Sequence, residues 1–471
     1  MGVTSRLPSP IFSVVFLTIA AFFNSNVNHV HGGNDHHRIN IKHMKDKVLQ
    51  THQLTSNSSY GGESARVYHV TSFGADPTGK YDSTDAILEA IKNATSVSSG
   101  FLFNQIQNLG GARIDLDGGV YVISRPLQLP TAGLGNLVIH GGTLRASNNF
   151  PVNGYLIDLS DPQSGKLQYN FEYITLRDLL LDSNYRGGGI QVVKSLRISI
   201  DNCYITHFTT IGILVSGGHE TYIRNSFLGQ HIAAGGDPGE QGLNGTAIDL
   251  WGNDNAVTDV VIFSASIGIK LAGQANVLTG VHYYNKATGS GGTGVHIKLP
   301  GLTQTRIVNS YFGYAGIIAE DPVQLLISGC LFYEGAFISF KSVKGLISGV
   351  NVVDNIFNGT QKSTDIVQLD GGFNQINQVT IDRNTVGHGM NLKSTIGRGS
   401  INGSQRSWEV DLNPTLLFPN LIQHVEYMFI PDGNSFPRHV LRNMSNNRVV
   451  IESDMKVQAQ VIVMADQGKS Y

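Results

Sequence analysis

Eight short β-prone segments recur between residues 188 and 368, and each has a small residue or glycine followed by alternating apolar residues. Their apolar anchors lie 23, 35, 21, 26, 22, 21 and 28 residues apart. These anchors are Ile190, Ile213, Ile248, Ile269, Val295, Ile317, Ile338 and Ile366. A period of 20–30 residues built only from strands and turns predicts a solenoid, and the leucine-rich-repeat signature is absent. We therefore expect an all-β, single-stranded, right-handed parallel β-helix of about ten coils.

The composition agrees with this fold and narrows the class of function. Glycine contributes 55 of the 471 residues, and it can turn the corners of a coil where φ is positive. Charged residues make up only 14%, and the formal net charge is -2. Because a nucleic-acid-binding protein needs a basic face, this balance argues against a nucleic-acid partner.

The ends of the solenoid carry different signals. Ser83 precedes an amphipathic stretch, residues 84–94, which predicts an N-capped helix that covers the open N-terminal coil. The spacing fails after about residue 400, where we expect the last coils and a β-rich C-terminal cap. Cys203 and Cys330 each lie 13 residues after an anchor, five coils apart. At about 4.8 Å per coil they are too distant for a disulfide, so we expect two buried free thiols.

The N-terminus predicts export. Residues 11–23 are apolar but too short to span a bilayer, which is typical of a secretory signal peptide. We assign residues 1–32 to the signal peptide and its cleavage region, 33–65 to a His-rich flexible linker, and 66–471 to the β-helix catalytic domain. Six N-x-S/T sequons suit a secreted, extracellular glycoprotein. They are Asn57, Asn93, Asn244, Asn358, Asn402 and Asn443.

Several segments resemble known β-helix proteins. Residues 67–91 and 110–130 resemble the opening of pectate-lyase-like proteins. The segments SNYRGGGIQV, HFTTIGILVSGGHETYIRNSFLGQH and NDNAVTDVVIFSASIGI resemble plant Quartet-type polygalacturonases, secreted enzymes implicated in dissolving pectin around pollen tetrads. The likeness covers roughly residues 66–465. It implies hydrolysis of α-1,4-linked galacturonan with inversion, within the polygalacturonase-type glycoside hydrolases.

The sequence departs from the ordinary polygalacturonase motifs NTD, GDD, GHG and RIK. Ser183-Asn184-Tyr185, with Asp182 beside it, stands at the first motif, and Thr209-Thr210 replaces the paired acids. Gly229-Gln230-His231 approaches the third motif, and Gly268-Ile269-Lys270 keeps only the lysine of the fourth. The catalytic acids cannot be transferred one for one, so either the carboxylates have moved or the activity is weak or absent.

Strand alternation selects a carboxylate directly. Inverting hydrolysis needs one carboxylic acid and one carboxylate about 6.5–9.5 Å apart. Because Ile248 and Leu250 point inward, Asp249 points out onto an exposed strand face, one coil from Lys270. The loop before it carries Asp237, which we expect to be its partner, with Glu240 in reserve. A solvated strand acid and two ordinary loop acids is the competing interpretation.

A second register lies beyond the same strand face. Aligned turns place His219 and Asp254 one coil apart, so Asp254 could be the second carboxylate, with His219 tuning it or binding a hydroxyl. Asn255 and Asn276 share one register, which predicts a structural asparagine ladder. His231 is the nearest match to the polygalacturonase histidine.

The expected ligand is an acidic polymer. Galacturonate carboxylates need cations, for which the candidates are Arg186, Lys270, His296 and Lys298, with His219 for a hydroxyl. We expect a pectin substrate, no cofactor or metal, no membrane association of the mature protein, and a monomer. A pectate lyase, which would need a calcium cage of several carboxylates, and a non-catalytic pectin-binding β-helix remain the alternatives.

Overall fold

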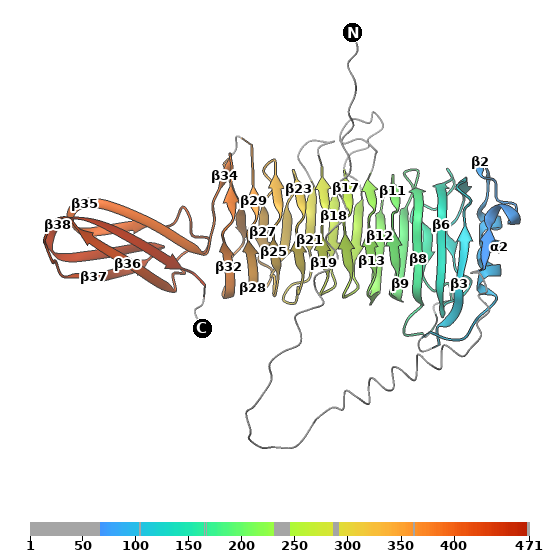
Figure 1. Ribbon diagram of the computed structural model, residues 1–471, viewed down its shortest axis with the longest axis horizontal. Helices are drawn as coiled ribbons and strands as arrows, with labels where there is room; N and C mark the ends of the chain where they lie inside the picture. The colour runs from blue at the N-terminus through green and yellow to red at the C-terminus, as the bar shows by residue number, and fades with distance from the viewer. Residues whose placement is uncertain are drawn as a thin grey trace, which may run out of the picture. The chain divides into compact units, whose positions relative to one another are not determined.

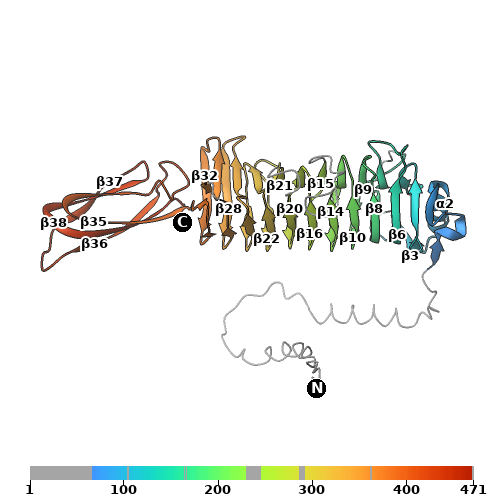
Figure 2. The same cartoon turned by 90° about the horizontal axis from the view of Figure 1, so that it is seen from above.

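The computed structural model describes residues 66–102, 105–163, 165, 167–229, 245–285, 292–360 and 363–468. The predicted signal peptide and His-rich linker therefore lie outside the described residues. The strands of the repeats run parallel and stack coil upon coil in one sheet of 32 strands, as Figures 1 and 2 show. Crossover connections between parallel strands of one sheet are right-handed. The predicted right-handed parallel β-helix is therefore confirmed.

Each coil contributes strands to three ladders, which form three faces of the β-helix. The first face consists of β5 (Leu127–Gln128), β7 (Tyr155–Leu159), β9 (Gly188–Leu196), β12 (Ile211–His219), β15 (Thr246–Leu250), β18 (Ile267–Leu271), β21 (Thr293–Ile297), β24 (Ile317–Glu320), β27 (Ile338–Lys341) and β31 (Val367–Asp370). These ten strands agree with the predicted number of coils.

The second face follows the first along each coil. It consists of β1 (Val67–His69), β3 (Gln107–Asp115), β6 (Leu134–Ala146), β8 (Phe171–Asp182), β10 (Ser199–Asp201), β13 (Tyr222–Arg224), β16 (Ala256–Thr258), β19 (Val277–Thr279), β22 (Arg306–Val308), β25 (Leu326–Ser328), β28 (Leu346–Val353) and β32 (Gln375–Asp382).

The third face completes the coil, and the long strands β6 and β8 contribute to it as well. Its other strands are β2 (Thr78–Asp82), β4 (Val120–Ile123), β11 (Tyr204–Thr206), β14 (Phe227–Gly229), β17 (Val261–Phe263), β20 (His282–Tyr284), β23 (Tyr311–Gly313), β26 (Leu331–Tyr333), β29 (Ile356–Phe357) and β33 (Thr385–Val386). The short strands β30 (Thr364–Asp365) and β34 (Met390–Asn391) pair separately.

The predicted anchors form one inward row on the first face. From Ile190 to Ile338 each predicted anchor is the Cα partner of the next, and all of them are buried. The last anchor is wrong by one residue, because Ile338 pairs with Val367 instead of Ile366. Ile366 and Val367 are both fully buried, so the apolar pattern alone could not choose between them.

The N-terminal end of the core is covered by a helix, as the sequence predicts. The helix α2 (Thr84–Thr95) follows the short 3-10 helix η1 (Val70–Phe73), and its apolar residues Ile87 and Ile91 join the main core cluster. Ser83 stands at its N-cap, but its side chain makes no capping hydrogen bond; the Asp82 carboxylate accepts one from the Thr84 N–H at 2.9 Å.

The two cysteines and the asparagine ladder also lie as predicted. Cys203 and Cys330 are buried free thiols, and burial raises their pKa values to about 12 and about 11. The Asn255 amide donates to the Asn276 side-chain oxygen at 3.0 Å.

After the last coil, the C-terminal region forms a four-stranded antiparallel sheet. Its strands are β35 (Ile396–Asp411), β36 (His424–Pro431), β37 (His439–Ser445) and β38 (Arg448–Asp466). A separate cluster of buried residues around Trp408 supports it. The predicted β-rich C-terminal region is therefore present, but it has a core of its own instead of continuing the coils.

The predicted glycosylation sites differ in accessibility. Asn402 and Asn443 are exposed on the C-terminal sheet, whereas Asn93 and Asn358 are half-buried. Asn57 and Asn244 lie outside the described residues. In the part of the chain that the structure describes, the helices are too short or too polar to cross a membrane.

Candidate functional site

The outward side chains of the first face form a row that contains the predicted carboxylate. Asp249 is the Cα partner of Leu214 on one side and of Lys270 on the other, and Lys270 is the partner of His296. The Lys270 Nζ lies 2.8 Å from Asp249 Oδ2 and 4.9 Å from the centre of the Trp251 ring. The predicted neighbourhood of Asp249 and Lys270 is confirmed, and we call this row of the first face the charged row.

The expected exposure of Asp249 is wrong. Only 4% of its side chain is exposed, against 20% for Lys270. Alternation predicts the direction of a side chain but not what lies over it, and here large neighbours lie beside the carboxylate. Burial, followed by the charges of Asp249 and Asp158, raises the pKa of Tyr155 to about 12, which shows that this phenol lies near both acids.

Two buried carboxylate oxygens on the charged row lack a hydrogen-bond partner among the described residues. They are Asp249 Oδ1 and Asp158 Oδ1, while Asp158 Oδ2 accepts a bond from the Gln128 amide at 2.6 Å. A buried polar atom without a partner is uncommon and calls for an explanation such as a ligand. The sequence analysis missed Asp158, although it lies at the position of Asp249 three coils earlier.

Further charges lie towards the C-terminus in the outward register two residues along these strands, because the Cα partner of His296 is Ile318 whereas Glu320 is the partner of Lys341. His296 Nε2 lies 3.3 Å from Glu320 Oε1, and Lys341 Nζ lies 3.4 Å from the same oxygen. Glu320 is buried and was also missed, although it stands three residues after the anchor Ile317 and so points outward. Lys298 is exposed, and no carboxylate among the described residues pairs with it.

Asp254 and His219 meet in a separate pocket at the turn between the first and second faces. His219 Nδ1 lies 3.1 Å from Asp254 Oδ2, which confirms the predicted stacking of the two turns. The pocket measures about 260 Å³, and it is lined by Tyr169, Leu196, Arg197, His219, Glu220 and Asp254.

An arginine organises the acids of this pocket. Arg197 NH1 lies 2.6 Å from Glu172 Oε1, and its Nε lies 2.9 Å from Glu220 Oε2. The side chains of Asp254 and Glu220 are 53% and 37% exposed. Two accessible carboxylates on adjacent coils therefore stand beside a histidine here, whereas Asp249 is buried.

Of the remaining predicted residues, Arg186 is described by the structure, and it does not join the charged row. Arg186 donates from its Nε to the Phe150 carbonyl oxygen at 2.6 Å, a structural contact. Asp237, Glu240 and His231 lie outside the described residues.

Asp182, which lies beside the residues that replace the NTD motif, forms a separate cluster. Its carboxylate lies 2.7 Å from His207 Nδ1 and 3.3 Å from Arg145 Nε, and Tyr185 stacks on the His207 ring at 4.6 Å. Burial opposes ionisation of Asp182, but the hydrogen bonds from His207 and the Asn184 N–H, with the charges of His207 and Arg145, hold its pKa below the usual range.

One group among the described residues has the composition of a metal site. His69, Asp115 and Asp117 offer ligand atoms within 4.8 Å of one another. His69 Nδ1 already lies 2.5 Å from Asp117 Oδ1, and both side chains are partly exposed, so an ordinary ion pair explains the cluster.

Comparison with known proteins identifies the family. Residues 67–291 match the family model described as rhamnogalacturonase A/epimerase, pectate lyase-like. The chain is 62% identical over 409 residues to the polygalacturonase QRT3 of Arabidopsis thaliana, an alignment that covers 86% of this chain and 85% of that protein.

Among solved structures, ORF18 of Geobacillus virus E2 aligns with a TM-score of 0.51 at 14% identity and covers 90% of this chain and 81% of its own. This likeness concerns the fold alone. An endo-xylogalacturonan hydrolase of Aspergillus tubingensis aligns at 12% identity with a TM-score of 0.42, over 70% of this chain and 95% of its own. With its fold and its extensive identity to the Arabidopsis protein, the chain belongs to the polygalacturonase family of pectate-lyase-like β-helix proteins.

Proposed function

We propose that this protein is a glycoside hydrolase that cleaves α-1,4-linked galacturonan in pectin. The observation that carries the proposal is the 62% identity to the Arabidopsis polygalacturonase, which extends over 86% of the chain. An identity of this extent covers the coils that bear the charged row and the His219 pocket.

We assign the chemistry to the first face, with Asp249 as one catalytic carboxylate. Its support is the unpartnered buried Oδ1, the contact with Lys270 and the row of charges that continues to His296. Asp237, with Glu240 in reserve, is the proposed partner acid, because it is close in sequence to Asp249 and inversion requires a second carboxyl group about 6.5–9.5 Å away. Lys270 and His296 are proposed to bind the galacturonate carboxylates.

The pocket of Asp254 and His219 is a second candidate for the active site. It is favoured by the accessibility of Asp254 and Glu220, which stand on adjacent coils beside a histidine. In this alternative, Asp254 and Glu220 supply the acid pair, and Arg197 forms ion pairs with both Glu172 and Glu220.

The products distinguish hydrolysis from the alternative reactions. Purified protein is incubated with polygalacturonic acid with and without a chelator, and both reducing ends and ultraviolet absorbance are followed. Reducing ends without absorbance are the expected result. Absorbance from an unsaturated end, lost with the chelator, would indicate a lyase, and no product at all would leave a pectin-binding β-helix.

We further propose that the mature protein is secreted to the cell wall as a monomeric glycoprotein. The apolar residues 11–23 and the exposed sequons Asn402 and Asn443 support this. N-terminal sequencing of the secreted protein should find its first residue between positions 22 and 33. Glycosidase treatment should lower its apparent mass, and light scattering should give the mass of one chain.

A further inference from the structure

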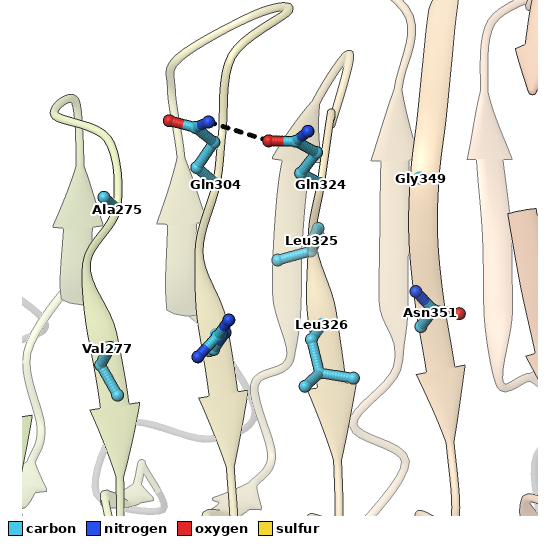
Figure 3. A pocket seen from close by; sticks show the side chains of 9 residues that line it. Ala275, Val277, Gln304, Gln324, Leu325, Leu326, Gly349 and Asn351 are labelled. Carbon is cyan, nitrogen blue, oxygen red and sulfur yellow. Dashed lines mark hydrogen bonds between the residues drawn. The ribbon is translucent and has the colours of Figure 1, made fainter. Parts of the chain in front are cut away.

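A groove among the described residues lies on the second face, one coil beyond the pocket of His219 and away from the charged row. It measures about 640 Å³ and crosses four consecutive coils, as Figure 3 shows. Its floor is formed by the outward side chains of β19, β22, β25 and β28, which are partners in one row: Val277, Arg306, Leu326 and Asn351. Its rim is formed by turn residues before β19, β22 and β25 and by Gly349 within β28.

The rim continues, on the next coils, the row of turns that forms the pocket of His219. Ala275, Gln304, Gln324 and Gly349 all have positive φ, as Glu220 and Asp254 have in the preceding coils. The Asp254 N–H donates to the Gln274 carbonyl, so the turn that holds Ala275 is one coil beyond Asp254. The groove thus begins where the acidic pocket ends.

The charge of the lining residues changes from the pocket of His219 to the groove. The pocket of His219 contains Glu220 and Asp254, whereas the groove is lined by one cation, three amides, small residues and leucine or valine side chains. Arg306 is exposed, and no carboxylate of the described chain lies within ion-pair distance of its guanidinium. The Gln304 amide donates to the Gln324 side-chain oxygen at 2.8 Å, which aligns two amides along the rim.

This chemistry suits an acidic sugar chain. The Arg306 guanidinium can bind a sugar carboxylate in a bidentate manner, and the free amide positions of Gln324 and Asn351 can bind hydroxyl groups. The apolar Val277 and Leu326 can contact the C–H faces of sugar rings. Coils stack at about 4.8 Å, so each coil can present its side chains to successive units of an extended polymer.

We propose that this groove is a second, non-catalytic binding site for an acidic polysaccharide, with Arg306 as its carboxylate ligand. The inference rests on the proposed function, because the ligand is the polymer that the enzyme cleaves. A site that continues from the pocket turn would hold a long chain on the β-helix while a distant segment of it is cut.

The test compares affinity for a polymer with cleavage of a short substrate. Affinity electrophoresis in gels containing polygalacturonate gives Kd for the full-length secreted protein and for the variants Arg306→Gln, Gln324→Glu and Arg113→Gln. Arg113 is a matched control, since it is an exposed arginine on an outward position of β3 without a carboxylate partner among the described residues. Hydrolysis of a galacturonate trimer, too short to span both sites, is measured in parallel.

We expect Arg306→Gln to weaken polymer binding about tenfold, as the loss of a charged hydrogen-bonded contact does. Gln324→Glu should weaken it as well, because it places a carboxylate beside the acidic chain. Arg113→Gln should bind as the wild type does, and trimer hydrolysis should be unchanged in all three variants.

Equal affinity of Arg306→Gln and wild type would overturn the proposal, as would an equal loss with Arg113→Gln, which would indicate nonspecific attraction. Loss of trimer hydrolysis in folded Arg306→Gln would also overturn it, since the groove would then be catalytic. If the wild type cleaves no galacturonate at all, the proposed function fails, but a loss of binding confined to the groove variants would still support this site.

Discussion

Replacing Lys270 by methionine tests the charged row through stability. Lys270→Met removes the cation 2.8 Å from Asp249 Oδ2 and leaves a carboxylate whose side chain is only 4% exposed. At an effective dielectric constant of about 20, two unit charges at this distance attract each other by about 6 kcal/mol, which desolvation partly offsets. Removing one partner of a buried pair leaves the other uncompensated and lowers the free energy of unfolding by about 3–5 kcal/mol.

The control and the rescue come from the same face. Lys298→Met changes an exposed lysine without a carboxylate partner among the described residues, so its effect should stay within about 0.5 kcal/mol. The double variant Asp249→Leu/Lys270→Met removes both charges and should recover most of the lost stability. Urea unfolding followed by circular dichroism gives all three values.

Two results would refute this account of the pair. In one, Lys270→Met is as mild as Lys298→Met, so that water reaches Asp249 freely. In the other, the double variant is no more stable than Lys270→Met, so that the loss reflects packing of the lysine stem against Trp251.

Three further predictions concern the core and the Asp182 cluster. Phe332→Ala empties a fully buried site in a stack of three phenylalanine rings and should cost about 3–5 kcal/mol in urea unfolding; a change below about 1 kcal/mol would contradict the stack. Cys203 and Cys330 should resist a thiol reagent at pH 8 and both react in denaturant, since burial raises their pKa values to about 12 and about 11; fast reaction of the native protein would contradict their burial. The pKa of Asp182 is held low, so its stabilising contribution is present above the unfolded value of about 4 and is lost as the pH falls through the lower folded value. Asp182→Asn should therefore flatten the dependence of the melting temperature on pH below about pH 4, and an unchanged slope would show that His207 does not stabilise the ionised form.

Much of the fold can be predicted from the spacing of apolar residues, because every coil needs an apolar side chain at the same inward position. From Ile190 to Ile338 every anchor pairs with the next. This pairing needs only one apolar residue at the inward position of each coil. The slip at Ile366 occurs where the apolar residues Ile366 and Val367 stand side by side, and a sequence period cannot resolve one residue there. The separate core around Trp408 was not predicted, because antiparallel pairing leaves no fixed period.

Only the parts of the site that depend on strand register could be predicted from the sequence. Neighbours one coil apart, such as Asp249 with Lys270 and His219 with Asp254, follow from counting residues. The burial of Asp249 depends on side chains from other coils, among them Tyr155, and counting along one repeat does not reveal it.

Residues missed at the sequence level fall into two kinds. Glu320 contacts His296 and lies two residues beyond Ile318, the Cα partner of His296, so the alternation of outward residues along that strand could have found it. Arg197, which joins Glu172 to Glu220, lies in a turn with positive φ, where neither the strand nor the helix period applies.

The most direct test of the central claim compares Asp249→Asn with Asp254→Asn. Both changes are nearly isosteric, and matching circular dichroism and melting curves would show that both variants are folded. Initial rates of reducing-end release from polygalacturonic acid should fall by about 100-fold or more in Asp249→Asn, because a catalytic carboxylate contributes a factor of that order. Asp254→Asn should stay within a few-fold of the wild type. The reverse pattern, with Asp249→Asn active and Asp254→Asn inactive, would contradict the claim and move the active site to the pocket of His219.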